Sequence, residues 1–143
     1  MSEPEAAEVR IRGATAADIP GLEELIAPFV EANRLLHRTS DELGELLENG
    51  FVAEHDGRIV GFAALEVYSK KMAEIRSLAV DSSQQRSGIG RKLVTACVER
   101  ARQQNVLEVM AITSSDDFFK SCGFDFTLPG EKKALFITPL DDK

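Results

Sequence analysis

The chain has 143 residues, of which 43% are hydrophobic and 29% are charged. This is the composition of a folded protein, and the length suits one domain with its own core rather than two. Lys and Arg total 17 against 24 Asp and Glu, so the net charge of -7 excludes the basic surface of a typical nucleic-acid-binding protein. An anion must therefore be bound by a local arrangement of groups.

The sequence carries no membrane or secretion signal. No window approaches the ~20 apolar residues of a transmembrane helix, and residues 1–8 are acidic without the apolar segment of a secretory signal. We expect tails at 1–8 and 140–143 around a domain over 9–139. Cys97 and Cys122 form no recognisable pattern, so we expect free thiols in a cytoplasmic protein, and the few His and Cys residues are too widely spread for a zinc site.

The first third of the chain predicts one strand and two helices. Residues 9–12 alternate between apolar and basic side chains, which is typical of a strand. Thr15 then caps a helix whose apolar residues recur at helical spacing. Thr39 or Ser40 caps a second, shorter helix that ends near residues 49–50.

A hairpin and a third strand of the hairpin series follow. Residues 51–55 and 58–67 are rich in strand-forming side chains, and Asp56-Gly57 between them is a strong signal for a two-residue turn. Residues 72–80 predict the next strand. These strands are expected to pair in sequence order and antiparallel to one another.

The second half of the chain predicts two helices and three strands. In chain order they are a long helix that opens at Gly88-Ile89-Gly90, a strand over 106–113, a short helix from Asp116 or Asp117 to Gly123, and strands over 124–126 and 134–138. Hairpin-linked strands followed by a single strand–helix–strand crossover predict an α/β (α+β) fold. Its central sheet would be mixed, mostly antiparallel, and flanked by helices on both faces.

The connection into the long helix is the most informative segment. Residues 81–87 are polar, and Gly88 and Gly90 stand where the helix begins. The first turn of a helix has unpaired N–H groups and the positive end of the helix dipole, and glycine lets an anion approach that backbone closely. Arg86 and Arg91 add positive charge. The alternative is a helix entry whose glycines serve only turn geometry; neither a dinucleotide fingerprint nor a P-loop is present.

The same loop carries a resemblance to a known family. Gln85-Arg86-Ser87-Gly88-Ile89-Gly90 fits the Gln/Arg-x-x-Gly-x-Gly/Ala signature of the GNAT superfamily of acyl-CoA-dependent N-acetyltransferases, which the chain resembles from about Val9 to Pro139. Residues 74–80 resemble that family's pantetheine-binding strand, and 119–124 its aromatic-xxx-Gly-Phe element. Three segments also look similar to the acetyltransferase domain of N-acetylglutamate synthases, which implies arginine biosynthesis: 36–39, 73–80 and 132–135.

The resemblance implies acetyl-CoA as acyl donor, without a metal. Its diphosphate would lie on the loop amides and its pantetheine arm would pair with the preceding strand, which places the thioester near Ser77 and Leu78, where a main-chain N–H can stabilise an oxyanion. The reaction would be direct attack by an amine, with neither cysteine as nucleophile. The expected donor-binding residues are Leu78, Ala79, Val80, Gln85, Arg86, Ser87, Gly88, Ile89, Gly90 and Arg91.

A carboxylate near the thioester is needed to accept the proton of the attacking amine. Glu74 on the donor strand is the first candidate, because a matching Glu is the base in the synthases that the chain resembles; the alternative is a strand-end carboxylate that faces solvent or pairs with Arg76. Glu66 on the adjacent strand is a weaker candidate.

The departing thiolate is protonated by a Tyr in many members of the family. Phe119 stands at that position here, and Tyr68, the only tyrosine, is expected to lie elsewhere. Thr113 or Ser114 is the candidate replacement, and the alternative for both hydroxyls is capping of the next helix.

Basic residues mark the expected acceptor site. Arg38, Arg76 and one of Lys132 and Lys133, with Lys133 preferred, would suit the carboxylates of an amino acid, because Arg donates two parallel hydrogen bonds to such a group. Glutamate is the preferred acceptor, and ordinary surface ion pairing is the alternative for each residue.

Two other functions remain open: acetylation of another amine, such as a polyamine, protein N-terminus or antibiotic, and a non-catalytic CoA-binding module. The expected partner is a small-molecule amine, with no nucleic acid and no membrane, and exposed strand edges are compatible with a homodimer.

Overall fold

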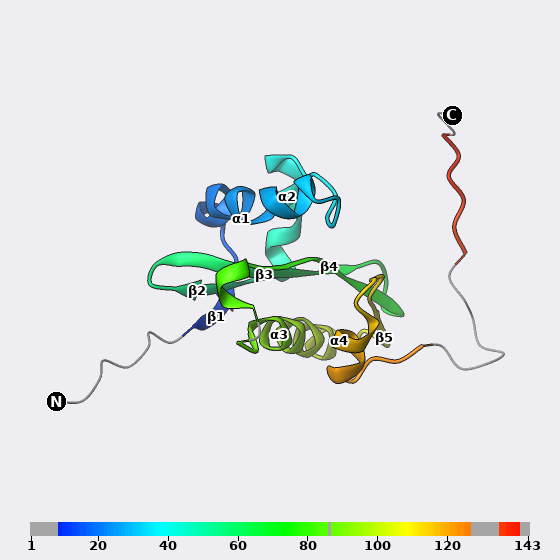
Figure 1. The fold of residues 1–143 in the computed structure, drawn as a ribbon. Helices are drawn as coiled ribbons and strands as arrows, with labels where there is room; N and C mark the ends of the chain where they lie inside the picture. The colour runs from blue at the N-terminus through cyan, green and yellow to red at the C-terminus, as the bar shows by residue number, and fades with distance from the viewer. Residues whose placement is uncertain (1–8, 86, 127–134, 141–143) are drawn as a thin grey trace.

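Five strands form one sheet with helices on both of its faces (Figure 1). The computed structural model describes residues 9–85, 87–126 and 135–140; the expected tail at 1–8, Arg86, Lys132, Lys133 and 141–143 lie outside this description. The strands are β1 (Arg10–Gly13), β2 (Gly50–His55), β3 (Arg58–Val67), β4 (Met72–Val80) and β5 (Glu108–Met110). The helices are α1 (Ile19–Glu31), α2 (Ser40–Leu46), α3 (Ile89–Gln103) and α4 (Asp116–Ser121), with 3-10 turns at Ala16–Asp18, Leu47–Asn49 and Ser82–Gln84.

The sheet has the order β1-β2-β3-β4-β5, and only the pair β4–β5 is parallel. The β2–β3 turn is tight because Asp56 and Gly57 both adopt left-handed conformations, with φ of 51° and 76°, as a type I′ turn requires. The predicted Asp-Gly turn and the predicted fold class are therefore confirmed. The single parallel crossover runs from β4 through α3, so it contains the glycine loop.

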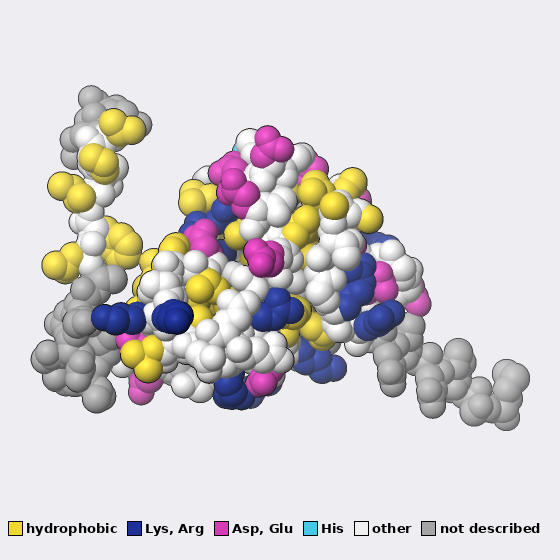
Figure 2. Space-filling model, turned by 180° about the vertical axis from the view of Figure 1, so that it is seen from behind, with side chains coloured by type: hydrophobic (Ala, Val, Ile, Leu, Met, Phe, Trp, Pro, Cys, Tyr) yellow, Lys and Arg dark blue, Asp and Glu magenta, His cyan; other side chains and the backbone are white. Residues whose placement is uncertain are grey.

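The two faces of the sheet have separate cores. On one side α1 and α2 cover the sheet, and on the other side lie α3 and α4 (Figure 1). The first core includes Leu22, Leu43, Val52 and Phe62, and the second includes Val60, Leu65, Leu93 and Val94. On the face that Figure 2 shows, side chains of both charge signs are scattered and form no single large basic patch. None of the helices in the described ranges has the length and apolar character of a membrane-spanning helix.

A buried ion pair joins β1 to the start of α1. Arg12 donates to both carboxylate oxygens of Asp18 at 2.9 Å and to Glu54 at 3.0 Å, while the backbone N–H of Thr15 donates to Asp18 at 2.8 Å. Asp18 is only 7% exposed. The hydrogen bond from Arg12 is the main cause that holds the pKa of Asp18 below its ordinary value. The capping residue and the first-turn acid thus set where the helical segment begins.

Two predicted strand boundaries are wrong, for one shared reason. Helix α4 ends in a Schellman motif, in which Gly123 has a φ of 97° and the N–H of Phe124 donates to the C=O of Phe119 at 3.0 Å. Helix α3 ends in the same way through Asn105, with a φ of 57°, and the N–H of Val106. Phe124 and Val106 were each expected to begin a strand, but their backbones serve to end helices.

The predicted terminal strands are accordingly reduced. Residues 124–126 form no strand, and the strand expected over 106–113 is limited to Glu108–Met110. Residues 135–138 form no strand either, and Leu135, Phe136 and Ile137 are exposed; Ala134 lies outside the description. A strand needs a neighbour to complete its hydrogen bonds, and residues 135–138 have no such neighbour among the described residues.

Candidate functional site

Along one edge of β4, six of its nine residues have no partner strand in the described part of the chain. Strand β5 pairs with β4 only from Met72 to Glu74. The backbone from Ile75 to Val80 is therefore open on that side. Free N–H and C=O groups in an extended row are suited to pairing with an extended ligand, as in strand addition.

A β-bulge interrupts β4 within this open part. Phe62 pairs with Ala79 and Ala64 pairs with Arg76, so Ser77 and Leu78 lie opposite the single residue Ala63. Ser77 has a φ of 58°, which is rare for a residue with a side chain. Because a bulge leaves a residue out of the regular ladder, it re-aims backbone groups next to the open edge.

The start of α3 has the geometry of an anion site. Gly88 is the N-cap residue with a φ of 85°, and no side chain caps the helix. The N–H groups of Ile89, Gly90 and Arg91 are in the first turn, where helices leave donors unpaired. A Cβ added at Gly88 would meet no protein atom within 4 Å, whereas one at Gly90 would lie 3.2 Å from Phe118. Gly88 therefore faces open space, and Gly90 permits close packing of α4.

Side chains of the glycine loop hold its own backbone. Asp81 accepts hydrogen bonds from the N–H and the hydroxyl of Ser83, and Gln85 donates to the C=O of Val80 at 3.1 Å. Ser87 donates to the C=O of Gln84. The guanidinium of Arg91 donates to the C=O of Ser121 at 2.7 Å, so this side chain ties α3 to α4.

A cavity of about 710 Å³ joins the open edge, the bulge and the start of α3. Eight of the predicted donor-binding residues line it: Leu78, Ala79, Val80, Gln85, Gly88, Ile89, Gly90 and Arg91. Ser87 is not among the lining residues, and Arg86 lies outside the description. The wall also includes Phe29 and residues 33–35, at and after the end of α1. No local motif marks these residues, because only the packing of α1 on the sheet brings them here.

Glu74 lies at the last position where β4 is paired with β5. It is 8% exposed and is not among the residues that line the cavity, although the next residue, Ile75, is. Glu74 pairs across the sheet with Glu66, and Arg76 lies on the same face of β4. The structure thus brings both predicted carboxylates together beside the open edge.

Tyr68 is a neighbour of the candidate base that sequence reasoning did not assign. Its hydroxyl donates to Oε1 of Glu74 at 2.5 Å, so the only tyrosine touches the candidate base. Burial, and then the hydrogen bond to Glu74, raise the pKa of Tyr68 to about 12, which keeps the phenol protonated. A sequence signal existed: alternation along the hairpin puts Tyr68 on the face of Glu66, which pairs with Glu74.

The basic residues predicted to bind the acceptor do not form one cluster, because Arg38 and Arg76 contact different partners. Nε of Arg38 donates to Oγ of Ser77 at 3.0 Å, which brings the α1–α2 connection to the bulge of β4. Arg76 donates to Oε2 of Glu66 at 3.1 Å and lies 3.7 Å from Oε1 of Glu74. The ion-pairing alternative therefore holds for Arg76. Lys133 lies outside the described residues.

The two candidate hydroxyls both line the cavity but have different contacts. Oγ1 of Thr113 accepts a hydrogen bond from the N–H of Ser115 at 2.8 Å, which is a contact within the turn before α4 and does not cap that helix. The Ser114 hydroxyl has no hydrogen-bond partner within the described ranges. Ser114 is the better candidate for a proton donor.

Cys97 lacks the character of a nucleophile. Cys97 is buried in the second core, and burial raises the pKa of its thiol to about 12. Phe119, which stands where many family members have Tyr, is also buried and packs edge-on against Phe118 and Phe124. This position therefore offers no phenol hydroxyl. Among the residues that the structure describes, no three His, Cys, Asp or Glu side chains gather as a metal site.

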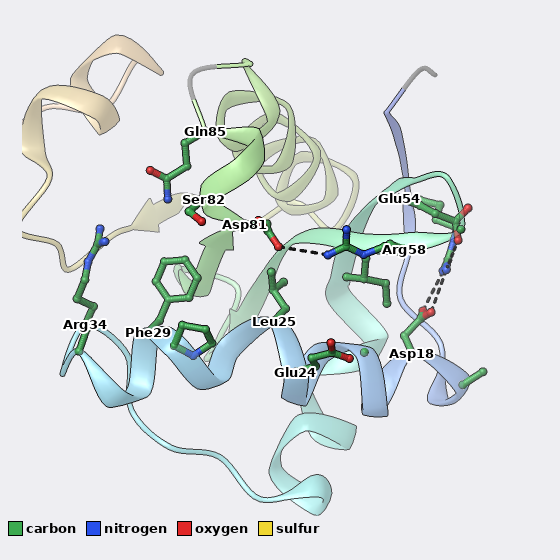
Figure 3. A pocket seen from close by; sticks show the side chains of 17 residues that line it. Asp18, Glu24, Leu25, Phe29, Arg34, Glu54, Arg58, Asp81, Ser82 and Gln85 are labelled. Atoms are coloured by element: carbon green, nitrogen blue, oxygen red, sulfur yellow. Dashed lines mark hydrogen bonds and ion pairs between the residues drawn. The ribbon is translucent and has the colours of Figure 1, made fainter. Parts of the chain in front are cut away.

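A second hollow of about 730 Å³ lies between α1 and the β2–β3 turn (Figure 3). Its lining includes the Arg12–Asp18 pair and Arg58, whose guanidinium lies 3.6 Å from Asp81. Of the predicted site residues only Gln85 lines it. The two cavities share Phe29, Arg34 and Gln85, so they meet near the end of α1.

Comparison with known proteins agrees with this geometry. Residues 20–124 match the model of the acetyltransferase (GNAT) family. An uncharacterised N-acetyltransferase of Chlorobaculum tepidum is 33% identical over 119 residues, which are 83% of this chain and 77% of that protein. An amino-acid acetyltransferase of Neisseria meningitidis is 34% identical over 118 residues, which are 81% of this chain and 27% of that protein.

A solved structure extends the similarity to the fold. N-acetylglutamate synthase from Neisseria gonorrhoeae, complexed with coenzyme A and N-acetyl-glutamate, superposes with a TM-score of 0.79 at 32% identity. The match covers 90% of this chain and 31% of the synthase chain. This chain therefore spans about a third or less of each Neisseria protein.

Proposed function

The chain belongs to the acetyltransferase (GNAT) family and is an N-acetyltransferase, and from that premise we propose that it acetylates the α-amine of a small amino acid, with glutamate preferred. The observation that carries the proposal is the open edge of β4, which begins beside buried Glu74 and ends at the uncapped start of α3. This arrangement supports a donor site and a proton acceptor on and beside one strand.

The residues present fit acetyl-CoA as the donor. The diphosphate would be held by the first-turn N–H groups of α3, where Gly88 leaves open space. The pantetheine arm would pair with the backbone of Leu78 to Val80. The bound donor supplies an activated acetyl thioester. The Leu78 N–H at the bulge is the candidate donor to the developing oxyanion.

Glu74 is the proposed general base. An amine attacks only in its neutral form, so the carboxylate accepts the proton of the ammonium group, directly or through a water. Ser114 is the proposed donor of a proton to the departing thiolate, since this residue lines the cavity. Glu66 has a different task, because it holds the guanidinium of Arg76.

Arg38 is the proposed contact for an acceptor carboxylate. Its Nε is engaged by Ser77, and within the described ranges its two terminal nitrogens have no hydrogen-bond partner. A planar guanidinium held at one nitrogen presents the others as a fork for a carboxylate. Arg76 and Lys133 are proposed as secondary contacts, with Arg76 restrained by Glu66.

A cationic acceptor is the second candidate, and the charges near the base favour it. Glu66 and Glu74 carry two negative charges against the single positive charge of Arg76. The local excess of negative charge suits a polyamine or an amine-rich antibiotic more than a dicarboxylate.

The test is an assay of CoA thiol release from acetyl-CoA with glutamate, other amino acids and a polyamine. We expect turnover with amino acids, and the highest kcat/KM with glutamate. A higher kcat/KM with the polyamine would favour the second candidate. Tight binding of CoA without turnover on any amine would refute the enzymatic proposal and leave a CoA-binding module.

A further inference from the structure

Tyr68 bridges the candidate base and the nearest arginine. Its hydroxyl donates to Oε1 of Glu74 at 2.5 Å and accepts from Nη1 of Arg76 at 3.2 Å. The same arginine nitrogen lies 3.7 Å from Oε1 of Glu74, beyond hydrogen-bond distance. The phenol therefore bridges a carboxylate and a guanidinium whose own contact is a long ion pair without a hydrogen bond.

The hairpin holds Tyr68 in this position. The N–H of Tyr68 donates to the C=O of Met72 at 3.0 Å, directly after β3 ends. The residue is 51% exposed, whereas Glu74 is 8% exposed, so the phenol reaches from the surface to a buried carboxylate. Arg76 is also held from the far side by Glu66 at 3.1 Å.

Resting on the proposed function, we propose that Tyr68 is a positioning residue for Glu74: its hydroxyl holds one carboxylate oxygen, leaves the other to receive the amine proton, and keeps Arg76 from closing onto the base. A shorter, hydrogen-bonded ion pair with Arg76 would stabilise the charged carboxylate more strongly than the present 3.7 Å pair and lower its tendency to take a proton. Tyr68 acts through Glu74 and is not assigned a contact with either substrate.

The chemistry of the neighbouring groups supports this role. The charged groups that face the phenol are Glu66 from β3 and Glu74 and Arg76 from β4, and the β5 residue that pairs with Glu74 is Met110. The raised pKa of Tyr68 keeps its proton in place for donation at neutral pH. The phenol is thus a fixed donor and not a second base.

The kinetic test is Tyr68→Phe, which removes only the hydroxyl. We expect kcat with the best acceptor to fall roughly 10- to 100-fold, as for a misplaced catalytic group, while the KM for acetyl-CoA stays the same. The matched control is Ser69→Ala, which removes a hydroxyl from the same turn, where Ser69 accepts from the N–H of Lys71. That variant is expected to keep its kcat.

The second test uses the chain's own spectroscopy. Because there is one Tyr and no Trp, near-ultraviolet absorbance reports the ionisation of Tyr68 alone. In the wild type we expect a titration midpoint at about 12, and in Glu74→Gln a midpoint moved toward the ordinary 10.0, without reaching it because burial persists. Glu99→Gln on α3 is the control without a shift, and circular dichroism verifies folding.

The outcomes separate this inference from the proposed function. Absence of turnover by the wild type on every amine refutes the proposed function and the inference with it, while the titration still tests the contact. With an active wild type, an unchanged kcat in Tyr68→Phe overturns the inference alone. The inference is also overturned if Glu74→Gln leaves the titration midpoint of Tyr68 unchanged. A rise in the acceptor KM of Tyr68→Phe at unchanged kcat would overturn it as well.

Discussion

Nε of Arg38 lies 3.0 Å from Oγ of Ser77, across a separation of 39 residues in the sequence. Ser77 is in the left-handed region with a φ of 58°, a conformation that costs a non-glycine residue roughly 1–2 kcal/mol. The contact thus ties the α1–α2 connection to a strained position of β4. A residue proposed to bind the acceptor and the bulge proposed to hold the thioester are joined by one hydrogen bond.

Replacement of Arg38 by Lys tests the hydrogen bond to Ser77 and the proposed contact of Arg38 with the acceptor. Lysine keeps the charge but lacks the Nε–H donor and the planar fork, so we expect the KM for glutamate to rise about tenfold or more, with a smaller change in the KM for acetyl-CoA. Steady-state kinetics with each substrate varied in turn measures both constants. Arg102→Lys on the exposed face of α3 is the control. A rise confined to the donor KM would contradict the role of Arg38 at the acceptor.

Glu74→Gln tests the general base. The amide cannot take a proton, so only acceptor that is already neutral reacts, and we expect kcat near neutral pH to fall roughly 10²–10⁴-fold. The deficit should shrink as the pH rises through the pKa of the α-amine, ~8, because deprotonation in solution then replaces the base. Rate–pH profiles of both proteins measure this. A constant ratio of the two rates across the profile would argue against proton removal by Glu74.

Gly88 tests the proposed donor site, and Gly57 in the β2–β3 turn is its matched control. Both have a positive φ, and an added Cβ would meet no protein atom within 4 Å at either position. Glutamate at either position should therefore cost about 1–2 kcal/mol of stability from the backbone. Only Gly88→Glu should weaken binding of CoA, by roughly tenfold or more, because it adds bulk and negative charge beside the first turn of α3.

Isothermal calorimetry with CoA and thermal denaturation of both variants measure these effects. If Gly57→Glu and Gly88→Glu bind CoA equally well, the diphosphate does not lie at the start of α3. Alanine at the same two positions gives a gentler comparison with the same expected order.

Asp18→Asn tests the ion pair that begins the first helical segment. Removing the charge should lower the free energy of unfolding at pH 7 by about 1–3 kcal/mol, because Arg12 loses its buried ion-pair partner and keeps Glu54 as the other. The pKa of Asp18 is held below its ordinary 3.8 in the folded state. Its contribution is therefore present in full above about pH 4 and is lost as the pH falls through the lower folded-state value.

Urea denaturation of both proteins over a range of acidic pH measures this dependence. The stability gap should narrow steadily below pH 4. Asp56→Asn is the control, because Asp56 is exposed and Asn suits the same turn. A gap that is independent of pH would mean that the Asp18 charge is not what stabilises the helix start.

Local patterns in the sequence were sufficient where a short segment decides its own conformation. The Asp56-Gly57 turn, the cap at Thr39 and the glycines before α3 were predicted and are present. Each depends on dihedral preferences or on hydrogen bonds within a few residues. The same local reasoning was wrong at Val106 and Phe124, because an apolar residue after a helix serves a strand and a Schellman motif equally well.

The sequence by itself determined the order of the elements through α4, the two helix-covered faces of the sheet and the position of the glycine loop. Only the tertiary structure decided the short pairing of β5, the bulge at Ser77 and the contact between Tyr68 and Glu74. The physical reason is that the register of strands and helices decides where the pairing of two strands stops and which side chains come into contact. That register is set by packing and hydrogen bonds between distant segments, which no local pattern encodes.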